Sequence, residues 1–108
     1  MNEMSIKEII DLIQNMAEEK GWGTKPEHVN FAEKIALAHS ELSEALNAYR
    51  KGNHSGKDGV NEELADALIR LLHLCGIYKI DICSEIIKKM DLNSKRSWDA
   101  DKLRKKTI

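Results

Sequence analysis

The sequence predicts an all-α fold in which four helices, packed antiparallel, form a single domain. Apolar residues recur at intervals of three and four along most of the chain, which is the period of a helix with one buried face. The chain has one proline and six glycines, and most of them fall between these periodic segments. A length of 108 residues suits one compact domain. We expect a core at about 20–96 and a basic tail at 97–108.

The first helix is predicted to begin at Ser5, because Ser5-Ile6-Lys7-Glu8 has the spacing of a capping box. Gly21-Trp22-Gly23 should end this helix, since glycine favours turns. The apolar stripe that it would bury consists of Ile6, Ile9, Ile10, Ile13 and Met16.

The second helix has two possible starts, at Thr24-Lys25-Pro26-Glu27 or at Asn30-Phe31-Ala32-Glu33, and should run to about Lys51. The segment 51–59, KGNHSGKDG, is glycine-rich and polar, which predicts a surface loop. The seam by which this helix would pack consists of Ile35, Ala38, Leu42, Ala45 and Tyr49.

The third helix, expected from about Val60 to Tyr78, is apolar around nearly its whole circumference. Ala65, Ile69 and Leu72 extend its apolar surface beyond one packing face. A helix of this kind is buried on nearly every side, and four short helices cannot easily provide that burial. We therefore expect a subunit interface here, in a homodimer or homotetramer.

A fourth helix is predicted to follow a turn marked by Gly76 and Asp81. The tail from Ser94 to Ile108 is basic and only weakly periodic, although Trp98 could anchor it. The core face of the fourth helix would consist of Ile82, Ile86, Ile87 and Met90.

Two pairs of acidic residues have the same spacing on consecutive predicted helices. Glu41 and Glu44 would share one face of the second helix, and Glu63 and Asp66 one face of the third. Antiparallel packing would let the four carboxylates converge, and they would repel one another unless a cation lay among them. Oxygen ligands without histidine or cysteine suit Mg²⁺ or Mn²⁺ rather than zinc. The alternative is two ordinary acidic pairs on solvated helix faces.

These motifs resemble a known family. Glu41-x-x-Glu44, 18 intervening residues and Glu63-x-x-Asp66 are similar to the ExxE…ExxD signature of the MazG-like all-α nucleoside triphosphate pyrophosphohydrolases. The run EKIALAHSELSEALNAYRKG at 33–52 looks like the first motif helix of that family, and NEELADALIRLLHLCGI at 61–77 looks like the second. Lys89-x-x-x-Asn93 followed by Arg96, and GWG at 21–23, also resemble family segments.

The resemblance implies a four-helix MazG-like bundle, completed by oligomerisation, that hydrolyses an NTP or dNTP to the monophosphate and pyrophosphate. The implied cofactor is Mg²⁺, with Mn²⁺ as the alternative. By position, the metal-binding and catalytic residues would be Glu41, Glu44, Glu63 and Asp66. The substrate-binding residues would be Lys89, Asn93, Arg96 and Trp22.

The residues also allow other interpretations. Lys89, Asn93 and Arg96 could form a solvated basic stripe, and Trp22 could be a hydrophobic anchor. Arg70 could neutralise Glu63 or Asp66 or contact a phosphate, whereas His73 suits a polar core or interface position. Alternative functions are a pyrophosphohydrolase for a specialised nucleotide, such as a phosphoribosyl-ATP, and a non-catalytic helical interaction module.

Composition limits the partners and the compartment. The 17 Lys and Arg residues against 18 Asp and Glu residues give a formal charge of −1, which favours neither nucleic acid nor a membrane surface. Cys75 and Cys83 lack CxxC spacing and are expected to be free thiols in a reducing compartment. The first residues do not have the pattern of a signal peptide, and no stretch approaches the ~18 apolar residues of a membrane span. We therefore expect a cytoplasmic protein.

Overall fold

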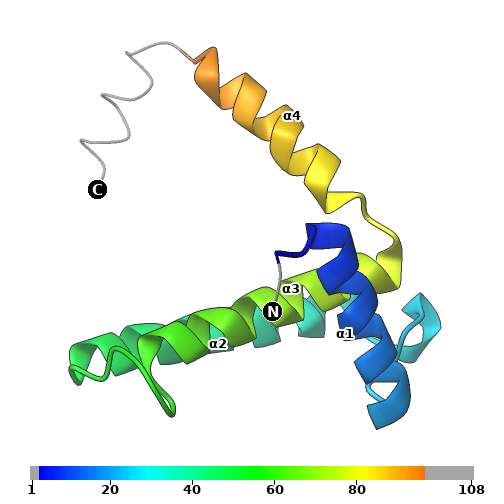
Figure 1. Cartoon of the computed structure of the whole chain (residues 1–108). Helices are drawn as coiled ribbons and strands as arrows, with labels where there is room; N and C mark the ends of the chain where they lie inside the picture. Colours follow the sequence, from blue (N-terminus) through cyan, green and yellow to red (C-terminus); the bar gives the residue numbers. More distant parts are fainter. Residues whose placement is uncertain (1–2, 97–108) are drawn as a thin grey trace.

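The computed structural model describes residues 3–96, and all regular structure within them is helical (Figure 1). The all-α prediction with four α-helices is therefore confirmed for this part of the chain. The elements in order are α1 (Ile6–Lys20), the short 3₁₀ helix η1 (Pro26–His28), α2 (Phe31–Arg50), α3 (Val60–Tyr78) and α4 (Ile82–Ser94).

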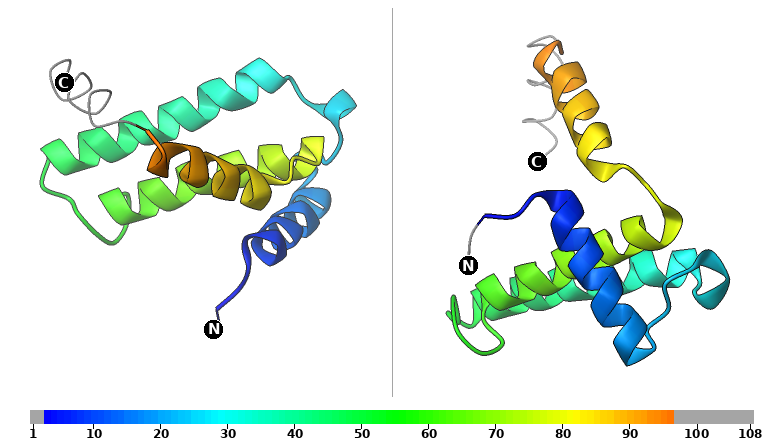
Figure 2. Two further views of the ribbon diagram at one scale, coloured as in Figure 1. Left: turned by 90° about the horizontal axis from the view of Figure 1, so that it is seen from above. Right: turned by 45° about the vertical axis from the view of Figure 1, so that its right-hand side comes forward.

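The helix α1 begins at the predicted capping box and crosses α3 (Figure 2). The Glu8 N–H donates to Ser5 Oγ at 3.1 Å, and the Ser5 N–H donates to Glu8 Oε1 at 3.0 Å. Where the two helices meet, a Cβ added to Gly76 would lie 2.9 Å from Gln14 side-chain carbons. Gly76 therefore lies inside α3 and permits close packing, so the prediction that it marks a turn is wrong.

The helices α2 and α3 lie side by side and run in opposite directions (Figure 2). Of the two possible starts of α2, the later one is used, because Asn30 Oδ1 accepts the Glu33 N–H at 2.9 Å. The loop at 51–59 joins the two helices, as predicted. Small residues let the helix backbones approach closely, and the buried alanines of this pair are Ala38, Ala45, Ala48 and Ala67.

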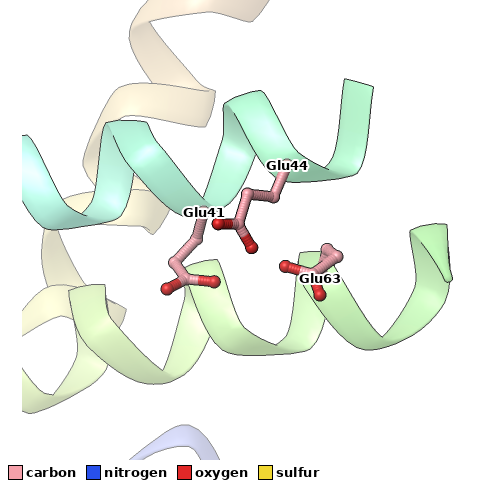
Figure 3. Close-up of side chains that lie close together, drawn as sticks. All are labelled: Glu41, Glu44 and Glu63. Atoms are coloured by element: carbon pink, nitrogen blue, oxygen red, sulfur yellow. The ribbon is translucent and has the colours of Figure 1, made fainter. Parts of the chain in front are cut away.

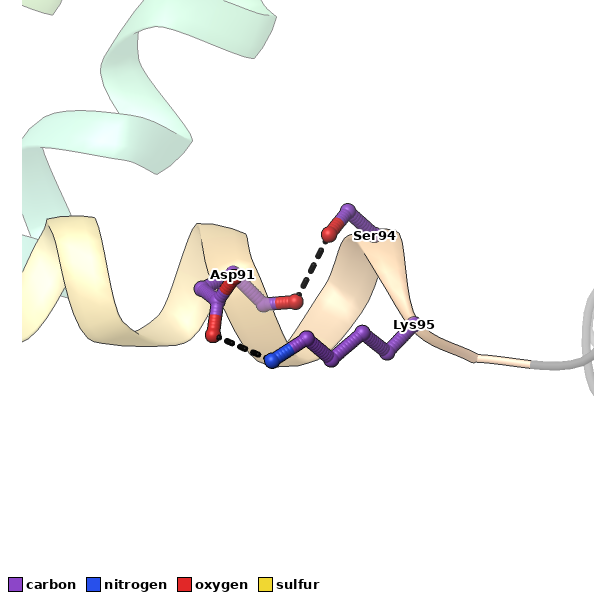
Figure 4. A network of polar contacts seen from close by, with 3 residues as sticks. All are labelled: Asp91, Ser94 and Lys95. Carbon is purple, nitrogen blue, oxygen red and sulfur yellow. Dashed lines mark hydrogen bonds and ion pairs between the residues drawn. The ribbon is translucent and has the colours of Figure 1, made fainter.

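The helix α4 extends away from the other helices and has no buried residue (Figures 1 and 2). Its predicted core face is wrong for the described chain, since Ile86, Ile87 and Met90 are 41%, 62% and 65% exposed. Its C-terminal end is held by local contacts, in which Lys95 Nζ lies 3.0 Å from Asp91 Oδ2 (Figure 4). Trp98 and the rest of the predicted tail lie outside the described residues.

Two apolar stripes on α2 and α3 are also exposed, contrary to the prediction that Leu42 and Tyr49 pack in a seam. At 100° per residue, each stripe borders the buried alanines on the side away from the acidic pair of its helix. We call Leu42, Leu46 and Tyr49 the α2 stripe and Leu64, Leu68 and Leu71 the α3 stripe; their exposures range from 37% to 62%.

The remaining predictions about thiols and membranes can be compared with the described residues. Cys75 is buried, Cys83 is exposed, and both are free thiols as expected. Within residues 3–96, no helix combines the length and hydropathy that a membrane crossing requires.

Candidate metal and nucleotide site

Three carboxylates point toward one another between α2 and α3 (Figure 3). One oxygen from each of Glu41, Glu44 and Glu63 lies within 4.8 Å of the others. Glu63 is only 5% exposed, and its Oε2 atom is buried without a hydrogen-bond partner. Buried polar atoms are nearly always paired in folded proteins. The unpaired Oε2 atom therefore marks a position where a proton or a cation would be stabilised.

The electrostatics of Glu63 support this interpretation. The pKa of Glu63 is raised to about 7, first by burial and then by its interaction with the neighbouring Glu44 carboxylate. The charges of Glu41 and Asp66 make smaller contributions to this pKa. Because like charges in a desolvated site disfavour ionisation, the metal-free cluster retains a proton near neutral pH.

Asp66, the fourth predicted acid, lies at the edge of this cluster. It is one turn beyond Glu63 on α3 and is exposed. Together with Glu41 it lines an adjoining cavity. The structure thus gathers three of the four predicted acids around a common point and places Asp66 in the wall of the adjoining cavity.

A second acidic group, formed by Asp58, Glu62 and Glu63, has a simpler explanation. Asp58 and Glu62 are exposed, and Glu62 Oε1 already accepts the Asp58 N–H at 3.2 Å. They lie at the N-terminus of α3, where free N–H groups favour acidic side chains. The group that contains Glu41 and Glu44 is therefore the candidate metal site.

A cavity of about 480 Å³ adjoins the acids. This volume is within the usual range for small-molecule sites of roughly 300–1,000 Å³. Its wall combines anionic, cationic, aromatic and apolar side chains: Trp22, Lys34, Glu41, Asp66, Ile69, Arg70 and His73.

Two cations of this wall can offset negative charge. Arg70 Nε donates to Glu41 Oε1 at 3.0 Å. The alternative that Arg70 neutralises Glu63 or Asp66 is therefore wrong, because its partner is Glu41. The Arg70 side chain remains 39% exposed and keeps further donors available. The sequence analysis did not identify Lys34. Its position seven residues before Glu41, two turns away on the same face of α2, is the signal that could have found it.

The aromatic part of the wall is held by the loop after α1. The backbone N–H of Trp22 donates to the Ala17 carbonyl at 3.0 Å. The centre of the Trp22 ring lies 6.5 Å from the centre of the His73 ring. His73 is 6% exposed, and its Nε2 atom lies 2.9 Å from the Gly23 carbonyl oxygen. Burial lowers the pKa of His73, and the charges of Lys34 and Arg70 lower it as well, although the Gly23 carbonyl opposes them. His73 is therefore a neutral polar core residue that also faces the cavity.

The other predicted substrate-binding residues are not brought to this site within the chain. Lys89 and Asn93 are exposed on α4, and Arg96 follows the end of that helix. Since α4 leads away from α2 and α3 (Figure 1), a ligand in the cavity would not reach these residues of the same chain.

Comparison of the chain with protein-family models, with curated proteins and with solved structures finds no match. The class of this protein can therefore be described only from its fold and from the chemical groups of its site. Over residues 3–96 it is an all-helical protein with a partly buried carboxylate cluster beside a cavity of about 480 Å³. The resemblance to the MazG-like family rests on the motifs at 33–52 and 61–77.

Proposed function

We propose that this protein is a Mg²⁺-dependent nucleoside triphosphate pyrophosphohydrolase, which cleaves an NTP or dNTP to the monophosphate and pyrophosphate. The observation that carries the proposal is the buried, unpartnered oxygen of Glu63 on α3, whose carboxylate faces those of Glu41 and Glu44 on α2 (Figure 3), while Glu41 also lines the cavity. A cluster of this kind is costly without a cation. Its all-oxygen donor set suits Mg²⁺, with Mn²⁺ as the alternative.

The residues of the site fit the needs of this reaction. The ion would be held by Glu41, Glu44, Glu63 and Asp66. When bound, Mg²⁺ supplies charge neutralisation for phosphate oxygens and for an attacking hydroxide.

The other residues of the cavity suit the ligand itself. Lys34 and Arg70 are placed to bind phosphate oxygens, because charged N–H donors form strong hydrogen bonds to phosphate. Trp22 offers a flat apolar surface to a base, and such stacking contributes about 1–3 kcal/mol per base.

We also infer that the protein acts as a homo-oligomer, at least a dimer. The α2 stripe, the α3 stripe and the apolar residues of α4 would otherwise form exposed apolar patches, which in proteins usually mark interfaces. In such an assembly, Lys89, Asn93 and Arg96 would contact a substrate bound to a neighbouring copy. Sedimentation that found a stable monomer at micromolar concentration would contradict this assembly.

The test is product analysis across a panel of common and modified triphosphates with Mg²⁺. Ion-exchange chromatography should find monophosphate and pyrophosphate rather than diphosphate and phosphate. Glu41→Gln and Glu44→Gln should each reduce the rate at least about tenfold, equal to ~1.4 kcal/mol of barrier. Glu33→Gln is the matched control, because Glu33 lies exposed on α2 outside the cluster. Full activity of both cluster variants would show that the metal-site assignment is wrong.

The alternative of a non-catalytic interaction module predicts a different response to the ion. An enzyme of the proposed kind binds Mg²⁺ in its native state, so the ion should raise its melting temperature. An interaction module with merely solvated acids should melt at the same temperature with and without Mg²⁺.

A further inference from the structure

The hydrogen bond between His73 and Gly23 fixes the tautomer of His73. A backbone carbonyl oxygen can only accept, so at 2.9 Å the Nε2 atom of His73 must be the donor. In a neutral imidazole the other ring nitrogen then carries a lone pair and no proton. His73 Nδ1 is therefore a hydrogen-bond acceptor.

The Gly23 carbonyl is held in place by its loop. Gly23 has φ of 94°, and a Cβ at this position would lie 3.0 Å from His28 Cβ and from Val29 Cγ1. The next residue is tied on both sides, because the Thr24 N–H donates to His28 Nδ1 at 3.2 Å and Gln14 Nε2 donates to the Thr24 carbonyl at 3.4 Å. A fixed loop keeps the His73 tautomer fixed as well.

The Nδ1 acceptor of His73 is open to the cavity. Within residues 3–96, the buried side-chain atoms without a hydrogen-bond partner are Gln14 Oε1 and Glu63 Oε2. His73 Nδ1 is not among them, although the side-chain hydrogen bond of His73 in this part of the chain is the one to Gly23. Nδ1 therefore keeps contact with solvent. Since His73 is 6% exposed and lines the cavity, we infer that this exposed surface of Nδ1 faces the cavity.

The surroundings of Nδ1 determine which part of a nucleotide it meets. A lone pair repels a phosphate oxygen but pairs with an N–H group. Trp22 and Ile69, which line the same cavity, suit a flat base, whereas phosphates are attracted to Lys34 and Arg70. The base therefore belongs against the side of the cavity that Trp22 and His73 line, and the phosphates belong beside the cations and acids.

We propose that His73 Nδ1 reads the base by accepting a hydrogen bond from its amino group, so that the cavity prefers cytosine and adenine nucleotides. Cytosine carries this amino donor at position 4 and adenine at position 6, whereas uracil and guanine present a carbonyl oxygen at the same places. A carbonyl oxygen facing the Nδ1 lone pair leaves two acceptors unpaired, which costs binding free energy. This specificity rests on the proposed function, in which the ligand is a nucleotide.

CTP and UTP test the inference, because they have nearly the same shape and differ at the position that is read. We would measure kcat/KM for both at pH 8 with Mg²⁺, where an ordinary histidine is already neutral. The affinity of CMP and UMP would be measured by calorimetry in the same buffer. Wild-type protein should prefer CTP over UTP, and CMP over UMP, by at least about tenfold.

Two variants separate the acceptor from the donor of His73. His73→Gln places an amide N–H near the position of Nε2, so it can still donate to the Gly23 carbonyl but has no acceptor at the position of Nδ1. It should keep the wild-type melting temperature and lose the preference. His73→Asn places a carbonyl oxygen near the position of Nδ1 and cannot reach Gly23. It should keep the preference and melt at a lower temperature.

The outcomes distinguish this inference from the proposed function. An active wild-type enzyme with equal kcat/KM for CTP and UTP would overturn base reading and leave the function standing. A preference unchanged in His73→Gln would overturn base reading in the same way. If no triphosphate were hydrolysed while CMP bound more tightly than UMP, the proposed function would fail and base reading would be supported. If neither monophosphate bound, base reading would be overturned.

Discussion

Replacing Glu63 with glutamine is the most direct perturbation of the candidate metal site. The change preserves side-chain volume and removes one negative charge from a position that is 5% exposed. Glu63 has the buried, unpartnered oxygen of the cluster and receives repulsion from Glu41, Glu44 and Asp66. The variant therefore removes a ligand charge without opening a cavity in the protein.

The size of the effect on metal binding follows from the pKa of Glu63. With a pKa of about 7, the carboxyl is protonated in about half of the metal-free molecules at pH 7 and in roughly nine of ten at pH 6. A cation binds the ionised form. Mg²⁺ binding should therefore release about half a proton at pH 7, and the apparent affinity should fall about tenfold per unit below that pH.

The same pKa determines how stability depends on pH. The ordinary pKa of 4.5 in the unfolded chain rises to about 7 in the folded protein, so the folded state binds more protons between these values. Metal-free wild type should therefore be more stable near pH 5.5 and should lose that stability as pH rises through 7. In Glu63→Gln this part of the pH dependence should be absent, and the metal-free melting temperature at pH 8 should equal or exceed that of wild type.

Calorimetry in two buffers of different ionisation enthalpy measures the released protons, and melting curves with and without Mg²⁺ measure the stabilisation. Glu63→Gln should lose most of the Mg²⁺-induced rise in melting temperature and at least about tenfold in activity. Glu33→Gln, the exposed control on α2, should behave as wild type. If Glu63→Gln kept both the Mg²⁺ response and the proton release, the cation would not bind at Glu63 and the reasoning would be refuted.

Three further substitutions test the cavity, α4 and the assembly. Lys34→Ala should raise the KM for the triphosphate several-fold with unchanged Mg²⁺ binding, because its ammonium group lines the cavity; unchanged kinetics would remove it from the site. Lys89→Ala should lower activity and leave Mg²⁺ binding intact. Kinetics equal to wild type would show that Lys89 belongs to a solvated basic stripe and does not bind the substrate. Leu68→Glu, in the exposed α3 stripe, should shift sedimentation toward monomer; an unchanged species would place the interface elsewhere.

The sequence predicted the local features of the fold well, because these depend on near neighbours in the chain. The capping box at Ser5 and the bounds of α3, Val60 and Tyr78, agree with the structure. The pairing of Glu41 with Glu44 on one face also follows from helix geometry alone. Convergence with Glu63 required the further expectation that α2 and α3 pack antiparallel, which the run of small alanines permits.

The predictions that went wrong concern what each apolar face packs against. The spacing of Ile86, Ile87 and Met90 correctly marks one apolar face of α4, but periodicity does not specify the surface that covers it. Leu42 and Tyr49 were assigned to the seam of α2 for the same reason. Gly76 was interpreted as a turn, although it serves a close approach to α1 that only the tertiary structure reveals.

The positions of the cavity residues depend on contacts between residues that are even farther apart in the sequence. His73 reaches the Gly23 carbonyl across 50 positions of sequence, and Arg70 reaches Glu41 across 29. Neither pairing produces a pattern among neighbouring residues of the sequence. The sequence could therefore suggest Trp22 as a substrate-binding residue, but it could not show which residues share its cavity. Lys34 was detectable only as a cation in helical phase with Glu41.

Charge and exposure both favour the proposed assembly with a second copy. With all side chains ionised, the site has a formal charge of −2, from the acids Glu41, Glu44, Glu63 and Asp66 and the bases Lys34 and Arg70. One divalent cation would balance that charge, but a triphosphate adds several negative charges that these residues leave uncompensated. Lys89 on α4 and Arg96 just after it would supply positive charge, and the apolar residues of α4 are uncovered in the single chain. An assembly that covered α4 against a neighbouring copy would thus supply the burial that α4 lacks and the cations that the site lacks.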